Sequence, residues 1–526
     1  AAHREAVGQF WGSQKLPDSA GLKAIDMFQA VADGQIKALW IIHTNPAVSM
    51  PDADRVRNAI AACPFVVVSD ITTQTDTARL ADVVLPATAW AEKSGTVTNS
   101  DRTISRQRPV LPAPGQARDD WDILADVGRR MGWNAAFDFQ RPVEIFREHA
   151  KLSGIAAGFG RDFDISGLGD LDDAAYETLE PSRWPVRAQQ TGGRFFAQGQ
   201  FFHTDGKARM LPLRWQPPAA KTGPRYPYRL NTGRIRDQWH TMTRTALSPR
   251  LSAHLAEPYV DINPVDAAAV HINPADLVRL RSPLGTAILR ARLTPDQSAG
   301  QLFAPMHWTG ETAPSARIDA LIPGAVDPVS GQPESKASVV AAERFDAAWY
   351  GFAVSSKPLH PTSDYWAKAR TPSGWRAELA GSATVENWEA EARHLFDLPD
   401  ATVTIIEDPA RGGARLAFFE NGLLCAALFV SSTPVAVMRD YVASQPGARN
   451  EQILTGQSPL DLPNPGPTVC ACFNIGMNTI LDAITEYRLM SVEEVGEALG
   501  AGTNCGSCKP ELSALLVSAQ PREAAE

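Results

Sequence analysis

Four of the six cysteines gather near the end of the chain. Cys470 and Cys472 form a Cys-x-Cys pair, and after 32 residues (473–504) Cys505 and Cys508 form a Cys-x-x-Cys pair. Thiolates are soft ligands, and a set of four binds either zinc or an iron–sulfur cluster. Close pairs in a cysteine-poor chain are typical of metal binding in a reducing compartment. Spacing alone leaves iron–sulfur, structural zinc and four unliganded thiols open.

Short helices are expected to position these cysteines. The stretch 477–487 carries apolar residues on one helical stripe. Ser491 and Glu494 have the spacing of a capping box, and the helix that they open is expected to end at Gly500 or Gly502. Pro510 can begin a final helix. The pattern predicts a small domain that folds around its metal.

The cysteine segment also resembles a known family. Residues 469–472 and the Gly-x-Gly-Thr-x-Cys-Gly-x-Cys loop at 500–508 are similar to the bacterioferritin-associated-ferredoxin-like 2Fe–2S domain, including the distance between the pairs. The resemblance implies a 2Fe–2S cluster, which passes single electrons, on Cys470, Cys472, Cys505 and Cys508. Cys63 and Cys425 lie alone and are expected to be buried structural thiols.

Composition narrows the function classes. A net charge of -9 argues against a nucleic-acid-binding surface, and 44% hydrophobic residues suit a globular protein with real cores. No apolar run approaches the ~18 residues of a membrane span. We expect a cytoplasmic protein with no membrane partner. Because the sequence starts at Ala1 with what reads as the middle of a domain, we also expect a native N-terminal part to be missing.

The first 135 residues alternate strand-like and helix-like patterns. Apolar, β-branched runs at 38–42, 65–68 and 81–86 are separated by polar or amphipathic stretches. This pattern predicts an α/β domain with a parallel sheet buried on both faces. Ligands of such sheets bind beyond the carboxyl ends of the strands, so the polar residues there are candidates for a site.

The remaining chain divides into segments with different predicted secondary structure. We predict a hairpin from strands 277–281 and 287–293, and a helix with Asn263 as N-cap and Pro264 at its first position. The predicted fold class is α/β plus β-barrel, with a small α+β domain and a small helical 2Fe–2S domain. The expected domains are 1–135 (α/β), 136–225 (connector), 226–345 (β-barrel), 346–460 (small α+β, role unknown) and 461–526 (2Fe–2S).

Most of residues 1–345 resembles the molybdopterin oxidoreductases. Residues 40–46, 69–70, 81–87 and 92–99 look like the third domain of that family. Thr232–Gly233–Arg234 and the barrel that follows resemble its dinucleotide-binding domain. The string 234–243 looks most like bacterial assimilatory nitrate reductases, some of which carry the ferredoxin-like tail.

The resemblance implies a bis(molybdopterin guanine dinucleotide) molybdenum cofactor. A carboxylate can accept two hydrogen bonds from the guanine edge, and cations can neutralise pyrophosphate or pterin oxygens. Each candidate alone also has a structural reading, such as a helix cap, a turn or a surface charge; their joint occurrence in family order favours binding. The implied cofactor-binding residues are Asn45, Ser69, Asp70, Lys93, Asp119, Thr232, Gly233, Arg234, Gln238, His240, Thr241 and Lys336.

One position departs from the family pattern. Where the family usually has asparagine, counting back from Asp327–Pro328 gives Asp319. A carboxylate lacks the amide donor and adds negative charge beside an anionic cofactor, so this contact is expected to be altered.

The resemblance implies the C-terminal part of a nitrate reductase. The molybdenum ligand and a 4Fe–4S cluster are expected upstream, so this fragment alone should not reduce nitrate. In the whole enzyme, nitrate would be the substrate, and a flavoprotein reductase, ferredoxin or flavodoxin would feed electrons through the 2Fe–2S tail. Three alternatives stay open: a formate dehydrogenase of the same family, a non-catalytic electron-transfer or docking protein, and a zinc-stabilised interaction module.

Overall fold

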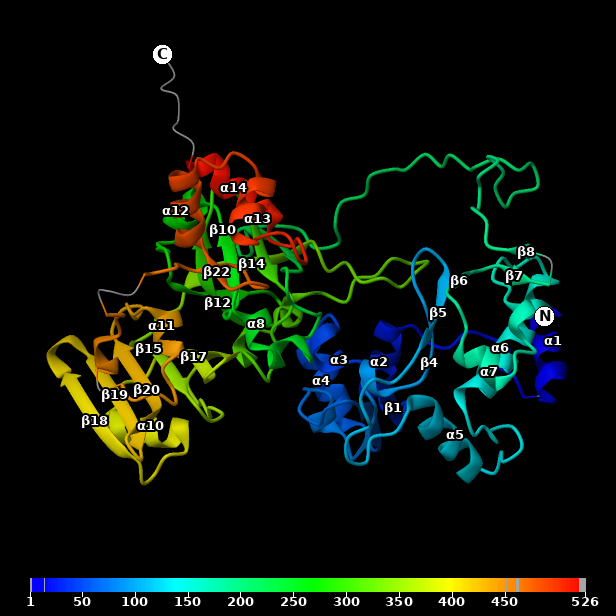
Figure 1. The fold of residues 1–526 in the computed structure, drawn as a ribbon, viewed down its shortest axis with the longest axis horizontal. Coiled ribbons are helices and arrows are strands. Elements are labelled where there is room, and N and C mark those ends of the chain that lie inside the picture. The colour runs from blue at the N-terminus through cyan, green and yellow to red at the C-terminus, as the bar shows by residue number, and fades with distance from the viewer. Residues whose placement is uncertain (1, 14, 189, 451, 460–462, 520–526) are drawn as a thin grey trace, which may run out of the picture. The chain divides into compact units, whose positions relative to one another are not determined.

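The computed structural model describes residues 2–13, 15–188, 190–450, 452–459 and 463–519. By internal contacts the chain divides into two units. Unit 1 consists of residues 1–44, 61–73 and 78–217, and unit 2 of residues 45–60, 74–77 and 218–526. Figure 1 labels the elements along the chain.

Unit 1 contains the predicted parallel sheet. Its strand order is β1-β2-β3, and both strand pairs are parallel. Val66 and Val68 lie on one face of the central strand β2 and are almost fully buried, whereas Val67 on the other face is partly buried. The bounds are β1 Leu39–Ile42, β2 Val66–Asp70, β3 Val83–Pro86, with helices α1 Ala2–Trp11, α2 Ala24–Ala32 and α5 Asp120–Arg130.

A second part of unit 1 forms its own small core. An antiparallel sheet in the order β4-β5-β6 and helix α6 surround Ile104, Phe146 and Ile165. Much of the expected connector 136–225 is therefore packed structure. The bounds are β4 Gly95–Thr98, β5 Thr103–Gln107, α6 Pro142–Ala157, α7 Asp173–Glu177, β6 Ser182–Arg183, β7 Val186–Arg187 and β8 Gln190–Thr191.

Unit 2 is built around a closed six-stranded barrel in the order β10-β12-β11-β14-β9-β13. The predicted hairpin is β11 and β12, which pair antiparallel from Leu277↔Arg290 to Arg281↔Thr286. Helix α9 has the predicted cap, because the Asn263 side chain accepts from the Val265 N–H. The bounds are β9 Tyr228–Gly233, β10 Tyr259–Ile262, β11 Leu277–Arg281, β12 Thr286–Leu293, β13 Gln301–Pro305, β14 Ser338–Arg344, α8 Pro249–Ser252 and α9 Pro264–Ala269.

Two helices from the early part of the chain belong mainly to this unit: α3 Pro46–Ser49 and α4 Ala53–Ala62. They attach to the 3₁₀ turn η6 (Ile318–Leu321) and its flanks. The Asp52 N–H donates to the Ile322 carbonyl at 2.8 Å, and Arg317 forms an ion pair with Asp54.

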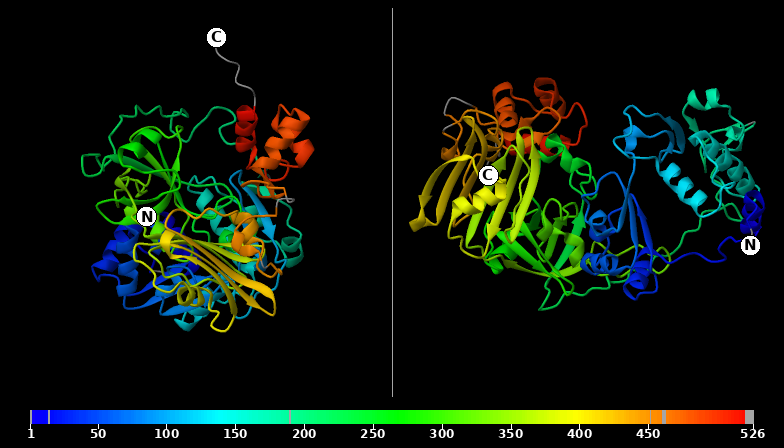
Figure 2. Two further views of the ribbon diagram at one scale, coloured as in Figure 1. Left: turned by 90° about the vertical axis from the view of Figure 1, so that its left-hand side faces the viewer. Right: turned by 90° about the horizontal axis from the view of Figure 1, so that it is seen from below.

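A six-stranded antiparallel sheet follows the barrel, in the order β16-β17-β15-β20-β19-β18. Figure 2 shows these strands in yellow and orange, lying side by side. A short helix, Arg439–Ala443, follows the last strand of this sheet in sequence. The bounds are β15 Trp349–Ser355, β16 Tyr365–Thr371, β17 Gly374–Gly381, α10 Trp388–Phe396, β18 Thr402–Asp408, β19 Gly413–Glu420, β20 Leu423–Ser431 and α11 Arg439–Ala443.

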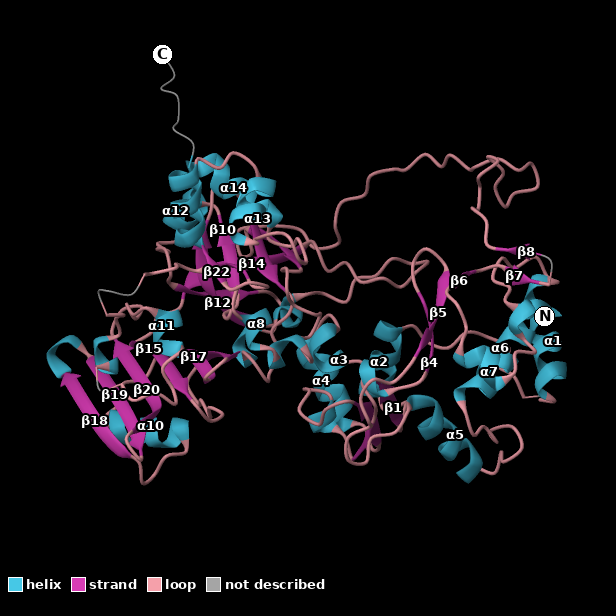
Figure 3. Ribbon diagram, viewed as in Figure 1, coloured by secondary structure: helices cyan, strands magenta, loops and turns pink. Residues whose placement is uncertain are grey.

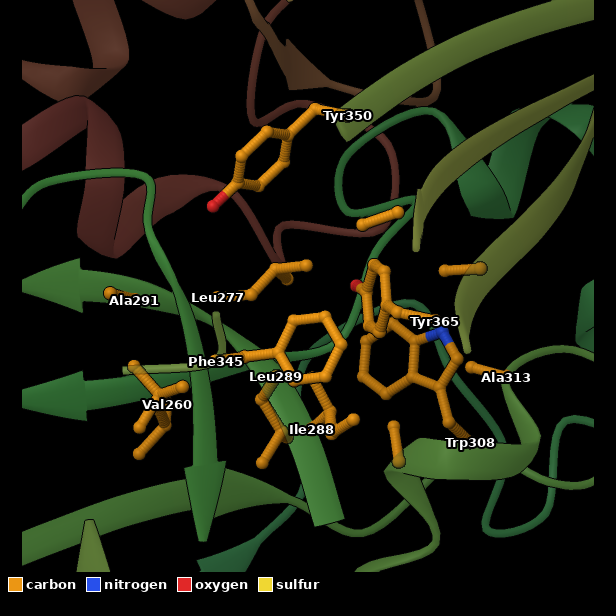
Figure 4. Packing of buried hydrophobic residues seen from close by; sticks show 14 of the residues in the cluster. Val260, Leu277, Ile288, Leu289, Ala291, Trp308, Ala313, Phe345, Tyr350 and Tyr365 are labelled. Atoms are coloured by element: carbon orange, nitrogen blue, oxygen red, sulfur yellow. The ribbon is translucent and has the colours of Figure 1, made fainter. Parts of the chain in front are cut away.

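The barrel and the six-stranded sheet share one hydrophobic core. Figure 4 shows Tyr350 and Tyr365 of the sheet beside Trp308, Phe345 and Leu277 of the barrel region. Trp308 and Tyr365 are almost completely buried. Because apolar burial is the main favourable term in folding, this continuous core joins the two parts into one packed body.

Cys470, Cys472, Cys505 and Cys508 lie in the last part of unit 2, whose helices α12, α13 and α14 are drawn in cyan in Figure 3. A short β-ribbon, β21 Thr468–Cys470 with β22 Ile475–Gly476, precedes α12 Met477–Tyr487, α13 Val492–Leu499 and α14 Lys509–Ala519. The predicted cap is present, since the Glu494 N–H donates to Ser491 Oγ at 3.2 Å. We call residues 468–519 the cysteine module.

Among the described helices, none combines the length and apolar character needed to cross a membrane.

Candidate functional site

The end of strand β2 carries two of the predicted cofactor residues of unit 1. Ser69 and Asp70 are its last residues, and both are buried. The Trp40 indole N–H donates to Ser69 Oγ at 2.9 Å, which fixes the hydroxyl. Asp70 Oδ1 accepts from the Ile71 N–H at 2.7 Å, so the carboxyl has a set orientation at the strand end.

Lys93, His43 and Asp120 form a second group at the same sheet edge. The sequence analysis predicted Lys93 as a site residue but not His43 or Asp120. Lys93 donates to Asp120 Oδ2 at 2.7 Å, and His43 Nε2 lies 2.6 Å from Asp120 Oδ1. Burial by itself raises the pKa of Asp120, but His43 and Lys93 outweigh it and hold that pKa below its usual value. His43 directly follows β1 and has a left-handed φ of 50°, a conformation that non-glycine residues adopt at a cost.

Asp119 is the N-terminal flanking residue of α5, but its carboxyl makes no capping hydrogen bond to the helix backbone. Its Oδ1 accepts from Thr88 Oγ1 at 2.6 Å, and its Oδ2 lies 3.3 Å from the Trp121 indole nitrogen. The Asp119 carboxyl therefore contacts side chains and does not cap the helix.

Asn45 belongs to unit 2 and precedes α3. Its Oδ1 accepts from both the Thr77 N–H at 3.1 Å and the Thr77 hydroxyl at 2.7 Å. The amide is thus held by the protein, and within the described residues its Nδ2 donors have no hydrogen-bond partner.

The end of β9 forms a second cluster of predicted residues in unit 2. Thr232 Oγ1 donates to the Ser335 carbonyl at 2.9 Å, and Lys336 Nζ donates to the Thr232 carbonyl. A Cβ on Gly233 would lie 2.7 Å from the Phe303 ring, so this position requires glycine. The lysine is brought to the strand end by residues 335–338, which lead into β14.

Three further groups lie near this lysine. His240 is half-buried, and burial, together with the cations Arg234 and Lys336, lowers its pKa. The carboxyl of Asp319 is buried, and burial raises its pKa to about 8 against a smaller lowering by Lys336. Among the described residues, this carboxyl has no hydrogen-bond partner. A neutral imidazole and a neutral carboxyl are both able to donate a hydrogen bond at pH 7.

Two other predicted residues of this loop, Gln238 and Thr241, form hydrogen bonds within the protein. Gln238 donates to the Leu251 carbonyl at 2.9 Å and accepts from Thr245 Oγ1 at 2.7 Å. Thr241 Oγ1 lies 3.0 Å from Thr243 Oγ1. Contacts of Gln238 and Thr241 to a cofactor therefore stay predictions, while their observed contacts shape the loop.

The sequence analysis did not identify His307, whose ring forms hydrogen bonds with the backbone of this loop. The Ile235 N–H donates to His307 Nε2 at 3.0 Å, so the ring proton lies on Nδ1 and is donated to the carbonyls of Trp239 and His240, at 2.9 and 3.0 Å. Burial lowers the pKa of His307, consistent with a neutral ring. We call residues 234–241 the cofactor loop.

The four cysteines of the module are arranged as two pairs. Cys472 Sγ lies 3.3 Å from Cys505 Sγ, and Cys470 is hydrogen-bonded to Cys508. Hydrogen bonds from Ser507 and Cys472 lower the pKa of the Cys505 thiol, whereas burial, with Cys470 beside it, raises that of Cys508 to about 11. In the described chain no three His, Cys, Asp or Glu side chains converge on one point. Two pairs of thiols fit a two-iron cluster, in which each iron takes two thiolates.

Comparison with known families agrees with this geometry. Residues 3–130 match the molybdopterin oxidoreductase family, and residues 228–339 match the molybdopterin dinucleotide binding domain. The chain belongs to the molybdopterin oxidoreductase family. Residues 468–518 match the BFD-like [2Fe-2S] binding domain, so this molybdopterin oxidoreductase carries a 2Fe–2S module at its end.

Individual relatives refine the comparison. A nitrate reductase of Klebsiella oxytoca is 40% identical over 97% of the chain and 59% of its own length. The F420-dependent formate dehydrogenase subunit alpha of Methanocaldococcus jannaschii is 32% identical, but over 64% of the chain and 47% of its own length. The chain thus spans about three-fifths of the nitrate reductase that it resembles.

A solved structure supports the fold. Acetylene hydratase from Pelobacter acetylenicus aligns with a TM-score of 0.50 at 17% identity, covering 65% of this chain and 50% of that one. At this identity the likeness concerns architecture alone.

The predicted residues therefore lie in two sets. Unit 1 holds Ser69, Asp70, Lys93 and Asp119, and unit 2 holds Asn45, the end of β9, the cofactor loop and Lys336. The donor set suits an anionic dinucleotide: cations, glycine at a close approach, and a buried carboxyl without a partner in the described chain. Each individual contact to the cofactor stays a prediction.

Proposed function

We propose that this chain is the C-terminal part of a molybdenum-dependent assimilatory nitrate reductase that receives electrons through its 2Fe–2S cluster. The observation that carries the proposal is the extent of the likeness to the Klebsiella oxytoca nitrate reductase, which covers 97% of the chain and so includes the cysteine module. The likeness to the formate dehydrogenase subunit covers 64%.

The overall reaction takes nitrate, two protons and two electrons to nitrite and water. When bound, the molybdenum cofactor supplies the two-electron oxygen-atom transfer. The residues of this chain bind and orient: Asp70 and Asp119 accept from guanine edges, and Lys93, Lys336 and Arg234 offset phosphate or pterin charge. Gly233 lets the backbone approach, and His240 and Asp319 offer neutral donors.

Other parts of the proposal concern the whole enzyme. We place the molybdenum ligand and a 4Fe–4S cluster in the segment that precedes this chain in the complete protein. We propose a flavoprotein reductase, ferredoxin or flavodoxin as electron donor, and a cytoplasmic location.

The test uses the complete enzyme, purified without oxygen. With reduced viologen as electron source we expect nitrite formation from nitrate, release of guanine nucleotide on acid treatment, and the visible absorption of a 2Fe–2S cluster. Formate oxidation without nitrite formation would instead establish the formate dehydrogenase alternative. Absence of guanine nucleotide would favour a docking protein, and a colourless, zinc-containing preparation would exclude the redox role of the module.

A further inference from the structure

A partly buried polar cluster joins the cysteine module to the barrel. It consists of Arg236, Asp237 and His254 on the barrel side and Glu511 of α14, and we call these four residues the clamp. Glu511 Oε2 lies 3.1 Å from Arg236 Nη2, and its Oε1 lies 3.1 Å from His254 Nε2. Arg236 also donates to the Val469 carbonyl, which precedes Cys470. The Glu511 carboxylate therefore contacts both Arg236 and His254. The Arg236 guanidinium contacts residues near the beginning and near the end of the cysteine module.

The clamp is more buried on its barrel side than a surface ion pair. The side chains of Arg236, Asp237 and His254 are 13%, 9% and 15% exposed, whereas that of Glu511 is 41% exposed. Burial by itself raises the pKa of Glu511, but His254 and Arg236 outweigh it, and the pKa is lowered. Partly buried, charge-assisted contacts of this kind hold one geometry, whereas exposed pairs contribute little.

Asp237 adds a direct contact to the cysteine loop. Its Oδ1 accepts from Ser507 Oγ at 3.4 Å, and the same hydroxyl lies 3.0 Å from Cys505 Sγ. Asp237 has a left-handed φ of 71°, which costs energy in a non-glycine residue. Its buried Oδ2 makes no hydrogen bond within the described chain, but it lies 3.7 Å from Arg236 Nε and 3.9 Å from His254 Nδ1.

The two thiol pairs differ in their surroundings. Cys470 and Cys508 are buried, whereas Cys505 is exposed and Cys472 is intermediate. Both pairs reach the clamp. Val469, next to Cys470, contacts Arg236, and Ser507 links Cys505 to Asp237.

The clamp also belongs to the cofactor loop. Arg236 and Asp237 lie between Arg234 and His240 in sequence, and His307 fixes the backbone of this stretch through Ile235, Trp239 and His240. The cofactor loop therefore both carries predicted cofactor residues and contacts the cysteine module.

We propose that the clamp holds the cysteine module against the cofactor loop in the geometry in which electrons leave the cluster across this loop. In each step the reduced cluster loses one electron and the group held by the loop gains it, so that two steps supply the electrons for one nitrate. The identity of the acceptor rests on the proposed function. Arg236, Asp237, His254 and Glu511 act as positioning residues.

The test is Glu511→Gln in the complete enzyme, which keeps the shape of the side chain and removes its charge. Glu497→Gln is the matched control, because Glu497 lies exposed on α13 of the same module. The enzymes are reduced, mixed with nitrate, and followed by the return of the visible absorption of the oxidised cluster. We expect reoxidation to slow by about tenfold in Glu511→Gln and to be unchanged in Glu497→Gln, since small displacements of reacting groups have large effects on rate.

Two readouts separate a positioning role from a folding defect. The reduced cluster should keep its EPR signal in both variants, and hydrogen exchange in 234–241 and in α14 should rise in Glu511→Gln. His254→Gln, made from the barrel side, should act in the same direction. Equal reoxidation rates in Glu511→Gln and the wild type would overturn the proposal. If nitrate oxidises no variant, the proposed function fails, and unchanged hydrogen exchange would then separately reject the clamp.

Discussion

Asp319 lies where the family resemblance leads us to expect asparagine, and its environment would make a carboxyl there resemble an amide. The side chain lies in η6, buried, with a pKa raised to about 8 by desolvation. At neutral pH the carboxyl is mostly protonated, and a protonated carboxyl can donate a hydrogen bond as an asparagine amide does. The added negative charge that the sequence suggested is therefore largely absent at pH 7.

Asp319→Asn should raise stability, and more so at higher pH. In the unfolded chain this aspartate ionises near its ordinary pKa of 3.8, whereas in the folded chain it stays protonated up to about pH 8. Between these values the folded state binds more protons, so the wild type loses stability as the pH rises. We expect the melting temperature of Asp319→Asn to exceed that of the wild type by several degrees at pH 8 and by much less at pH 5. A difference independent of pH would show that Asp319 is ionised in the fold.

The exposed member of a thiol pair gives a second prediction at this scale. Cys505→Ser should abolish the 2Fe–2S EPR signal of the reduced enzyme, because an iron loses a soft ligand, and should leave the guanine dinucleotide content unchanged. Cys63→Ser is the control, since the Cys63 thiol is buried near the carbonyls of Ile36 and Phe65, which a hydroxyl can also use. An undiminished signal in Cys505→Ser would remove Cys505 from the ligand set.

At the scale of elements, local chemistry was readable from the sequence. The strands β1 to β3 follow from β-branched runs, and the caps at Asn263 and Ser491 from side chains that can accept backbone hydrogen bonds. Contacts between residues that are distant in the sequence could not be predicted. His307 holds a loop some 70 residues earlier in the chain, and the role of Glu511 depends on docking against Arg236.

Strand β17 contains a buried charge cluster that the sequence did not reveal. Glu378 is buried and pairs with Arg439, with Nε–Oε1 at 2.6 Å, while Arg376 and Arg290 lie 3.6 and 3.9 Å away. Burial alone raises the pKa of Glu378, but the three guanidinium groups hold it below its usual value. The cluster lies where β17 meets α11 and the barrel, so it contributes to fixing the six-stranded sheet on the barrel.

Glu378→Gln should destabilise unit 2 by about 3 kcal/mol at pH 7. Arg439 loses its counter-charge, and Arg290 and Arg376 keep only Glu257 and Asp440 as partners. The exposed Glu386 supplies the control, Glu386→Gln. Since the folded pKa is depressed, the wild-type contribution is complete above the unfolded value of 4.5 and is lost as the pH falls through the folded value. Denaturant unfolding should therefore show a gap between wild type and Glu378→Gln that narrows below pH 4.5. A constant gap would point to a packing defect instead.

At the scale of the whole molecule, the parts of unit 2 differ greatly in how much core they bury. The cluster shared by barrel and six-stranded sheet contains 39 buried hydrophobic residues of the described chain, and the cysteine module has nine, two of which are cysteines. Domains of some 50 residues bury a smaller fraction of their surface than larger domains and are only marginally stable, so a metal, disulfides or a partner often adds stability. The module is therefore expected to take part of its stability from its cluster and part from the clamp.

Iron removal should consequently loosen the module and leave the barrel unchanged. After chelation under reducing conditions, we expect amide hydrogen exchange in α12, α13 and α14 to quicken by about tenfold or more, because metal binding and folding are coupled in such domains. Exchange in strands β9 to β14 should stay slow, since their core contains no thiol ligand. Reconstitution with iron and sulfide should restore protection, whereas protection restored by zinc alone would show that the thiols demand only a tetrahedral metal. Equal protection with and without metal would mean that nine buried residues and the clamp suffice to fold the module, and the cluster would then serve electron transfer alone.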